Sequence, residues 1–292
     1  MRTQSDPRAQ LLAGLPVSER RLELAGMATS VLEGGAGPAV VLLHGPGEFA
    51  AKWMCVIPEL AATHRVIAPD LPGHGESSVA GGPLNAGRVL AWLDELIEAT
   101  CPAPPTLVGH VLGGAIAARF AVQHGSRLAR LVLVDSLGLA PFRPAPMFAL
   151  TLAGFVLRPT DGTYRRFLQY CLHDAPRVRE RLGELWEPLL AYNLDRARTP
   201  SSRLAMRTLM REVGVPAIPP EQLARIGVET SLIWGRHDLA NRLRVAEAAS
   251  ARYGWPLQVI EDAADDPAIE QPHAFSAALR HALAATAVTA AR

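Results

Sequence analysis

The stretch Thr106–Gly114 reads TLVGHVLGG and has the spacing of a site that presents one side chain for nucleophilic attack. An apolar run leads into Gly109-x-Val111-x-Gly113, and apolar residues at helical spacing follow, which predicts a strand, a tight turn and a helix. A G-x-S-x-G turn of this kind holds its central residue in strained backbone, and the flanking glycines make room for the turn. Here the centre is Val111, whose isopropyl group can neither attack a carbonyl nor be deprotonated. The spacing therefore predicts the scaffold of a covalent catalyst without its nucleophile.

Short apolar runs that are typical of buried strands alternate with helical patterns along most of the chain. Predicted strands occupy 39–43, 65–68, 131–134, 229–234 and 257–260, with two edge strands within 22–33 and predicted helices at 48–60, 84–100 and 272–290. Strands that are apolar on both faces are typical of a parallel sheet covered on both sides. Their alternation with helices predicts an α/β protein with a mostly parallel, doubly wound sheet.

The pattern changes after Leu139, where three closely spaced prolines interrupt it. Several helical stretches follow to about Gly214 without a buried-strand run, and the strand pattern returns at 229–234. We therefore divide the chain into a first part of the core at 1–138, a helical cap at 139–226 and a second part of the core at 227–292.

Five motifs in this order resemble the α/β-hydrolase superfamily: LLHGPG at 42–47, APDLPGHGES at 68–77, LVGHVLGG at 107–114, IWGRHD at 233–238 and EDAADDPAIEQP at 261–272. The resemblance covers nearly the whole chain and implies the α/β-hydrolase fold, with the helical cap inserted at the usual place. A serine hydrolase of this superfamily needs a nucleophile, a histidine base, an acid that orients the histidine, and two N–H donors for the oxyanion.

The resemblance places the acid and the base of the superfamily after the last two predicted strands. The acid position holds Asp238, whereas the position expected for histidine holds Asp265. Two carboxylates in one partly buried pocket cannot both ionise cheaply, so one pKa should rise and the pair would supply a general acid and a general base. The alternative is that both face solvent or pair with an arginine such as Arg236. His273 is a weaker candidate for the missing base.

The resemblance also implies that one oxyanion donor is missing. The N–H of Leu112 is retained, but the second position is Pro46, which has no N–H, so Gly47 would have to replace it. His44 and His110 are expected to hold loops around the pocket rather than to react. The predicted substrate-binding residues are His44, Pro46, Gly47, His110, Val111, Leu112, Leu137, Met147 and Leu239.

The cap is rich in side chains that suit a large apolar ligand. They are Phe142, Met147, Phe148, Phe155, Tyr164, Phe167, Tyr170 and Trp186. Above an apolar floor at Val111, part of this set would contact a hydrophobic small molecule, while most would form the core of the cap itself.

Composition excludes several other classes of partner. The formal net charge of +1 offers no electrostatic basis for binding nucleic acid or an anionic membrane. Three widely spaced cysteines predict neither a disulfide framework nor a zinc cluster, and favour a reducing, cytoplasmic location. The dipeptides His173-Asp174 and His237-Asp238 lack the partners of a metal site, so we expect no metal and no cofactor. The sequence leaves a homodimer open.

We therefore expect a non-hydrolytic enzyme on this fold that binds a hydrophobic small molecule, such as a polyketide-like intermediate of secondary metabolism. Pocket shape and acid–base help from Asp238 and Asp265 would promote cyclisation, rearrangement, elimination or decarboxylation without a covalent intermediate. Two alternatives stay open: a non-catalytic binding protein, as some hormone receptors on this fold are, and a residual hydrolase that uses activated water.

Overall fold

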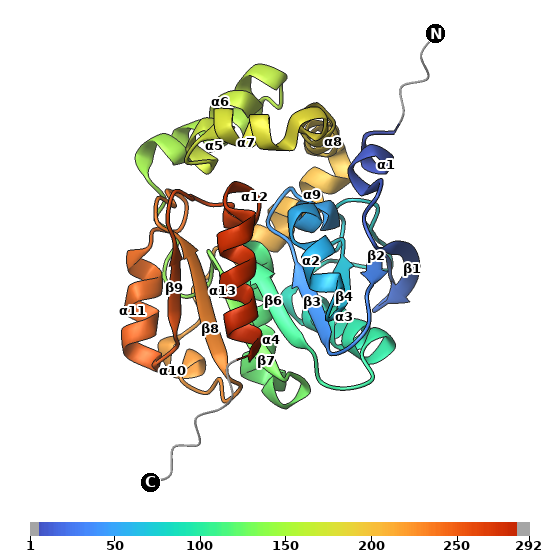
Figure 1. The fold of residues 1–292 in the computed structure, drawn as a ribbon, viewed down its shortest axis with the longest axis vertical. Helices are drawn as coiled ribbons and strands as arrows, with labels where there is room; N and C mark the ends of the chain where they lie inside the picture. The colour runs from blue at the N-terminus through green and yellow to red at the C-terminus, as the bar shows by residue number, and fades with distance from the viewer. Residues whose placement is uncertain (1–5, 285–292) are drawn as a thin grey trace.

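The computed structural model describes residues 6–284, and they surround one mixed, mostly parallel sheet (Figure 1). Its strands are β1 (Ser18–Leu24), β2 (Met27–Gly34), β3 (Ala39–Leu43), β4 (Arg65–Pro69), β5 (Ser78–Val79), β6 (Thr106–His110), β7 (Arg130–Val134), β8 (Thr230–Gly235) and β9 (Leu257–Ile260). The spatial order is β1-β2-β4-β3-β6-β7-β8-β9, and β5 pairs with β2. Strands β1, β2 and β5 pair in the antiparallel sense, and the strands from β4 to β9 along this order are parallel. The carboxyl ends of the parallel strands therefore share one edge, where side chains from distant parts of the chain meet.

Each central strand contributes alternate residues to two separate hydrophobic cores. In β3, Val41 and Leu43 pack on one face, whereas Val40 and Leu42 pack on the other. Such an alternation follows from the two-residue period of a strand, and here both faces are apolar because helices cover both. The predicted buried runs at 39–43, 65–68 and 131–134 correspond to β3, β4 and β7.

Helices cover the two faces of the sheet and one end of it. Those of the core are α2 (Ile57–Ala61), α3 (Ala86–Thr100), α4 (Leu112–His124), α11 (Arg244–Tyr253), α12 (Pro267–Glu270), α13 (Pro272–Ala284) and the 3-10 turns η1 (Ala50–Cys55) and η2 (Gly125–Arg127). Helices α3, α4 and α11 pack on one face, and η1, α2 and α13 pack on the other. The single helix predicted over 48–60 is instead η1 followed by α2, because Pro58 lacks the N–H of a helix interior and is accommodated in the first turn of a new helix. Of the predicted helix at 272–290, α13 ends at Ala284, and 285–290 lie outside the described residues.

The segment between β7 and β8 is helical, and α5–α8 lie over the carboxyl edge of the sheet, whereas its last helix, α10, lies at the opposite end, near the start of β8 (Figure 1). It contains α5 (Pro146–Leu157), α6 (Asp161–Cys171), α7 (Ala175–Leu182), η3 (Gly183–Leu185), α8 (Trp186–Arg198), α9 (Pro200–Leu209), η4 (Met210–Gly214) and α10 (Pro220–Leu223). A third hydrophobic core joins α5–α8 to α1 (Pro7–Leu12) and η1. We call α5–α9 the cap helices below. No helix among residues 6–284 is long and apolar enough to cross a membrane.

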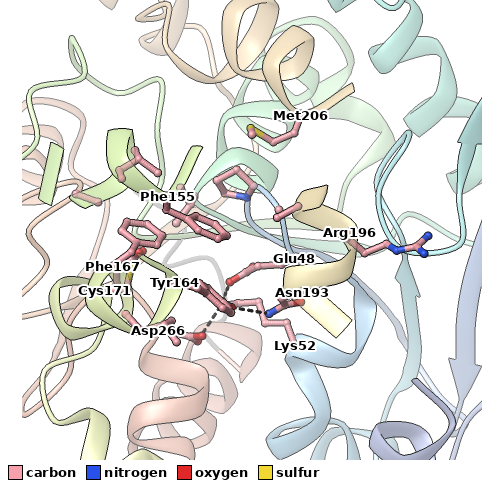
Figure 2. A pocket seen from close by; sticks show the side chains of 18 of the residues that line it. Glu48, Lys52, Phe155, Tyr164, Phe167, Cys171, Asn193, Arg196, Met206 and Asp266 are labelled. Atoms are coloured by element: carbon pink, nitrogen blue, oxygen red, sulfur yellow. Dashed lines mark hydrogen bonds and ion pairs between the residues drawn. The ribbon is translucent and has the colours of Figure 1, made fainter. Parts of the chain in front are cut away.

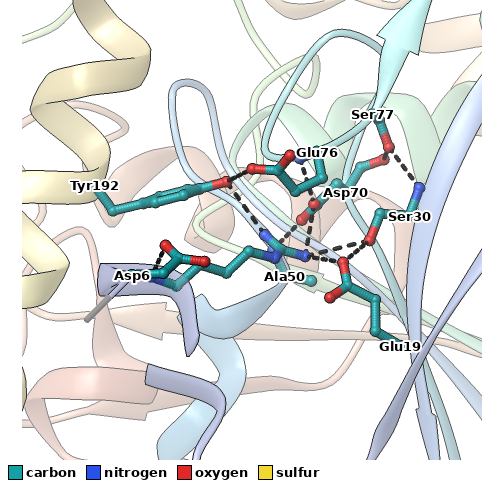
Figure 3. Close-up of polar contacts among 9 residues, drawn as sticks. Asp6, Glu19, Ser30, Ala50, Asp70, Glu76, Ser77 and Tyr192 are labelled. Carbon is teal, nitrogen blue, oxygen red and sulfur yellow. Dashed lines mark hydrogen bonds and ion pairs between the residues drawn. The ribbon is translucent and has the colours of Figure 1, made fainter. Parts of the chain in front are cut away.

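A buried arginine on α1 connects the sheet to the cap (Figure 3). The guanidinium of Arg8 lies 2.9 Å from the carboxylate of Asp70, at the end of β4, and donates to Glu19 of β1. It also donates to the hydroxyl of Tyr192 on α8, which in turn donates to Glu76. Because Arg8 and Asp70 are both buried, this network fixes α8 against the core through charge-assisted hydrogen bonds.

Candidate active site

The turn after β6 has the strained geometry of a nucleophile elbow, with Val111 at its centre. Val111 has φ 47° and ψ −102°, a conformation rarely adopted by a β-branched residue. A Cβ on Gly109 would lie 2.4 Å from the carbonyl oxygen of Gly113, and one on Gly113 would lie 2.5 Å from that of Leu43. The glycines are therefore required by close packing of the turn, and the chain bears a strain of about 1–3 kcal/mol to hold a hydrocarbon at this point.

The position expected for the histidine base is occupied by an aspartate with a free oxygen. Asp265 follows β9 and lines the cavity described below. Its Oδ1 is fully enclosed and has no hydrogen-bond partner among the described residues. Burial, and next the neighbouring Asp238, raise the pKa of Asp265 well above its usual range. Both effects favour the protonated form of this carboxyl group, which can donate its proton.

Asp238 lies behind Asp265 and does not line the cavity. Its Oδ1 accepts hydrogen bonds from the N–H groups of Ala240 (2.7 Å) and Asn241 (2.8 Å). Burial raises the pKa of Asp238 to about 6. The guanidinium of Arg236 pairs with Glu261 and not with Asp238. Asp238 is also buried, so it does not face solvent, which was the other alternative considered from the sequence.

A third carboxyl group, which we did not predict from the sequence, completes a row along the sheet edge. Asp135 follows β7, is fully buried, and accepts a hydrogen bond from the N–H of Gly235 (2.9 Å). Burial first, and then Asp238, raise the pKa of Asp135 well above its usual range. An aspartate directly after a buried strand was the available signal. The carboxyl groups at the ends of β7, β8 and β9 thus disfavour each other's ionisation.

The chain's single lysine lies at the floor of the cavity (Figure 2). Lys52, on η1, is only 2% exposed, and its Nζ lies 2.7 Å from Oδ1 of Asp266 and 3.2 Å from Oε1 of Glu48. Burial by itself would lower the pKa of Lys52, but Asp266 and Glu48 outweigh this and raise it. Burial would likewise raise the pKa of Glu48, but Lys52 and His110 lower it. The floor therefore carries a charged Lys52 and a charged Glu48. We did not predict this cluster from the sequence, although a single lysine in a chain whose other cationic side chains are arginines was an available signal.

His110 is turned toward this cluster rather than toward Val111. Its Nε2 donates to the carbonyl oxygen of Asp265 (2.6 Å), and its Nδ1 lies 3.4 Å from Oε2 of Glu48. His44 is fully buried, where Nε2 accepts from the N–H of Leu71 (2.9 Å) and Nδ1 donates to the carbonyl of Gly45. Burial lowers the pKa of His44 to about 3, so it is a neutral residue that supports the loop. His273 is exposed at the start of α13.

The loop that would complete an oxyanion hole carries a carboxylate. Pro46 has no N–H, and Oε2 of Glu48 accepts the N–H of Gly45 at 2.6 Å. Leu112 is the first residue of α4. A negative charge that developed above Val111 would therefore meet an ionised carboxylate where a hydrolase of this type has a donor.

A cavity of about 480 Å³ lies between the cap helices and the sheet edge. Among the predicted substrate-binding residues, Pro46, Gly47, His110, Val111 and Leu137 line it, whereas His44, Leu112, Met147 and Leu239 do not. Met147 is 48% exposed on the outer side of α5. Of the cap aromatic residues, Phe142, Phe148, Phe155, Tyr164, Phe167 and Trp186 line the wall. The cavity is thus mostly apolar, with polar groups on the floor and others, such as Asn193 and Arg203, on the cap helices. A mostly apolar lining with a few polar groups is typical of small-molecule sites.

One group of potential metal ligands occurs in the described part of the chain, outside the cavity. It consists of His173, His237 and Asp262, all exposed. In the sequence, each of the two histidines is followed by one aspartate, so no three-ligand motif is visible. Folding brings His173, His237 and Asp262 together from separate segments.

Comparison with known proteins agrees with this architecture. A family model described as the alpha/beta hydrolase fold matches residues 38–272. The pimeloyl-[acyl-carrier protein] methyl ester esterase of Aeromonas hydrophila is 30% identical over 270 residues, which cover 87% of this chain and 99% of that protein. The 2-hydroxy-6-oxo-6-phenylhexa-2,4-dienoate hydrolase of Comamonas testosteroni is 31% identical over 222 residues, with 70% and 73% covered. The structure of the enzyme with the same name from Rhodococcus sp. strain RHA1 superposes with a TM-score of 0.80 at 25% identity, covering 92% of this chain and 99% of that one.

Proposed function

Since the chain belongs to the α/β-hydrolase fold family but has Val111 at the nucleophile position, we propose that it is a non-hydrolytic enzyme that transfers protons on an apolar small molecule. The reaction would be a cyclisation, rearrangement, elimination or decarboxylation of an aromatic or polyketide-like compound. The observation that carries this proposal is the strained elbow at Val111, retained with its glycines although no covalent intermediate can form there.

Asp265 is the residue with the geometry for proton transfer. The residue is half-buried and lines the cavity next to the other polar groups of the floor, whereas its Oδ1 is enclosed and has no hydrogen-bond partner among the described residues. Its raised pKa favours the protonated form, which is the form that a general acid needs. The same carboxyl group, once deprotonated, serves as a base. Asp238 is then a positioning residue, because it lies behind Asp265 and contacts no cavity space.

The charges on the floor favour one kind of transition state. Glu48, Asp266 and Lys52 leave an excess of negative charge beside Val111, where a hydrolase would stabilise an oxyanion. This arrangement opposes an oxyanionic intermediate and favours positive charge or a hydrogen-bond donor on the ligand. Acid-promoted reactions of an unsaturated apolar molecule fit this requirement.

Several similar proteins are hydrolases by name, and two of those compared above act on a phenyl-substituted dienoate. An elongated, conjugated ligand of that shape suits the aromatic wall of this cavity. What differs here is the chemistry available at the floor, since the nucleophile and the histidine at position 265 are both absent from the sequence.

The proposal is tested with a probe for general-acid proton transfer in an apolar pocket, the protonation of the terminal carbon of α-methoxystyrene, which gives a cation that water converts to acetophenone and methanol. The absorbance of acetophenone is followed. We expect saturable turnover that falls as the pH rises through the raised pKa of Asp265, because the protonated form that donates to the probe is lost. Asp265→Asn should lower kcat at least about 100-fold, the usual contribution of a positioned general acid. Glu98→Gln, an exposed carboxylate change on α3, is the matched control.

Turnover that Asp265→Asn leaves unchanged would refute the assignment of proton transfer to this residue. Hydrolysis of short-chain p-nitrophenyl esters that disappears in Asp265→Ala would favour a hydrolase with activated water instead.

A second candidate is a non-catalytic binding protein, which is supported by the mutual pairing of Lys52, Glu48 and Asp266. Saturable binding of aromatic ligands with no turnover of any probe would favour that candidate.

A further inference from the structure

Three metal-ligating side chains from separate segments meet where the cap lies against the core. One donor atom from each of His173, His237 and Asp262 lies within 4.8 Å of the others. The imidazole rings of His173 and His237 stack with centroids 4.1 Å apart and planes 14° apart. We propose that these residues form a surface site for a divalent transition metal that clamps the cap to the core.

The segments come from both parts of the fold. His173 lies in the cap, between α6 and α7, whereas His237 follows β8 and Asp262 follows β9 in the core. A metal held by all three therefore crosslinks the cap to the sheet edge. The two residues before His173, Cys171 and Leu172, line the cavity, so the clamp also fixes one wall of it.

The backbone at each ligand is held in place by other contacts. The N–H of His173 donates to the carboxylate of Glu270 (2.6 Å), and the N–H of His237 donates to the carbonyl of Ala263 (2.9 Å). The side-chain amide of Gln271 donates to the carbonyl of Asp262 (3.1 Å). Ligands on a fixed backbone lose little conformational freedom on binding, which favours a preorganised site.

The donor set indicates which metals fit. Two imidazoles and one carboxylate suit Zn²⁺ and its neighbours in the first transition row better than Mg²⁺ or Ca²⁺, which prefer all-oxygen sites. Tetrahedral Zn²⁺ requires donor atoms about 3.3 Å apart, by the usual metal–ligand distances. The donor atoms of the three residues lie within 4.8 Å of one another. Because all three side chains are exposed, side-chain rotations would bring these atoms to the shorter spacing, and solvent would supply the fourth ligand.

The binding test uses the full chain after treatment with EDTA, titrated with ZnCl₂ by calorimetry. We expect one ion per chain, at least tenfold weaker binding in His173→Ala and in His237→Ala, and unchanged binding in His281→Ala, a control with an exposed histidine elsewhere. MgCl₂ should not compete. Equal unfolding temperatures in EDTA show that the variants are folded. Zinc binding that neither histidine variant weakens, or no binding at about millimolar zinc, would overturn the site.

The clamp is tested separately by hydrogen–deuterium exchange with and without ZnCl₂. Zinc should slow exchange in residues 172–182 of the unchanged protein and leave it unaltered in His173→Ala. If zinc binding depends on both histidines but exchange in this segment does not change, the metal site stands and its role as a clamp is refuted.

Discussion

Replacement of Lys52 by methionine should reveal how strongly the cavity floor depends on one ammonium group. Methionine has a similar length and no charge, so the substitution removes the partner of Asp266 at 2.7 Å and of Glu48 at 3.2 Å with little change in volume. At an effective dielectric constant of 20, these contacts correspond to gross attractions of about 6 and 5 kcal/mol. Desolvation of the buried lysine and of the two partly buried carboxylates offsets most of this.

The net loss follows from what the substitution leaves behind. Breaking a buried ion pair by removing one member costs about 3–5 kcal/mol, because the remaining charge is uncompensated. We therefore expect Lys52→Met to lower the free energy of unfolding by about that amount at neutral pH. Urea unfolding followed by circular dichroism would measure it, as a lower midpoint at an unchanged slope.

The pH dependence gives the sharper test. In the unchanged protein, Lys52 helps to lower the pKa of Glu48, so this carboxylate contributes stability above its unfolded pKa that is lost as the pH falls. In Lys52→Met, the burial of Glu48 is no longer offset by the lysine, so its pKa is higher than in the unchanged protein and the folded state gains a proton earlier as the pH falls. The difference in stability between the two proteins should therefore shrink on acidification.

The matched control neutralises the whole cluster. Lys52→Met combined with Glu48→Gln and Asp266→Asn leaves no unpaired charge, and it should recover most of the lost stability. A loss below about 1 kcal/mol in the single variant, or a loss of the same size at every pH, would contradict the electrostatic reasoning.

Two further predictions follow from the elbow and from α1. Val111→Ser should not produce esterase activity on p-nitrophenyl butyrate, because His110 points to Glu48 and Asp265 rather than to position 111, and Pro46 supplies no oxyanion donor; a clear gain of turnover or labelling by a fluorophosphonate would show that a base is within reach. Arg8→Met should destabilise the protein by about 3–5 kcal/mol in urea unfolding, because it leaves Asp70 buried without its countercharge. It should also speed hydrogen exchange in α8, and unchanged exchange there would contradict a role for Arg8 in holding the cap.

The fold could be predicted from the sequence because its signals are local. Buried strands such as 39–43 are continuous apolar runs, and the elbow at Gly109–Gly113 has a spacing that only a strand–turn–helix accommodates. The same locality explains the errors in detail. Pro58 divides a segment that we had predicted as one helix. Met147 lies on the outer side of α5, because this helix is apolar nearly all round and its periodicity does not select a buried face.

The sequence by itself determined that the centre of the elbow carries a hydrocarbon side chain, because the identity of residue 111 does not depend on how the chain folds. Only the tertiary structure decided which polar groups share the cavity. Lys52 and Asp266 are 214 residues apart and meet because η1 and the loop after β9 lie at the same end of the sheet. Likewise, the pairing of β8 with β9 brings His237 close to Asp262, and the packing of the cap against the core adds His173. Such distances depend on packing between segments, and local periodicity carries no information about them.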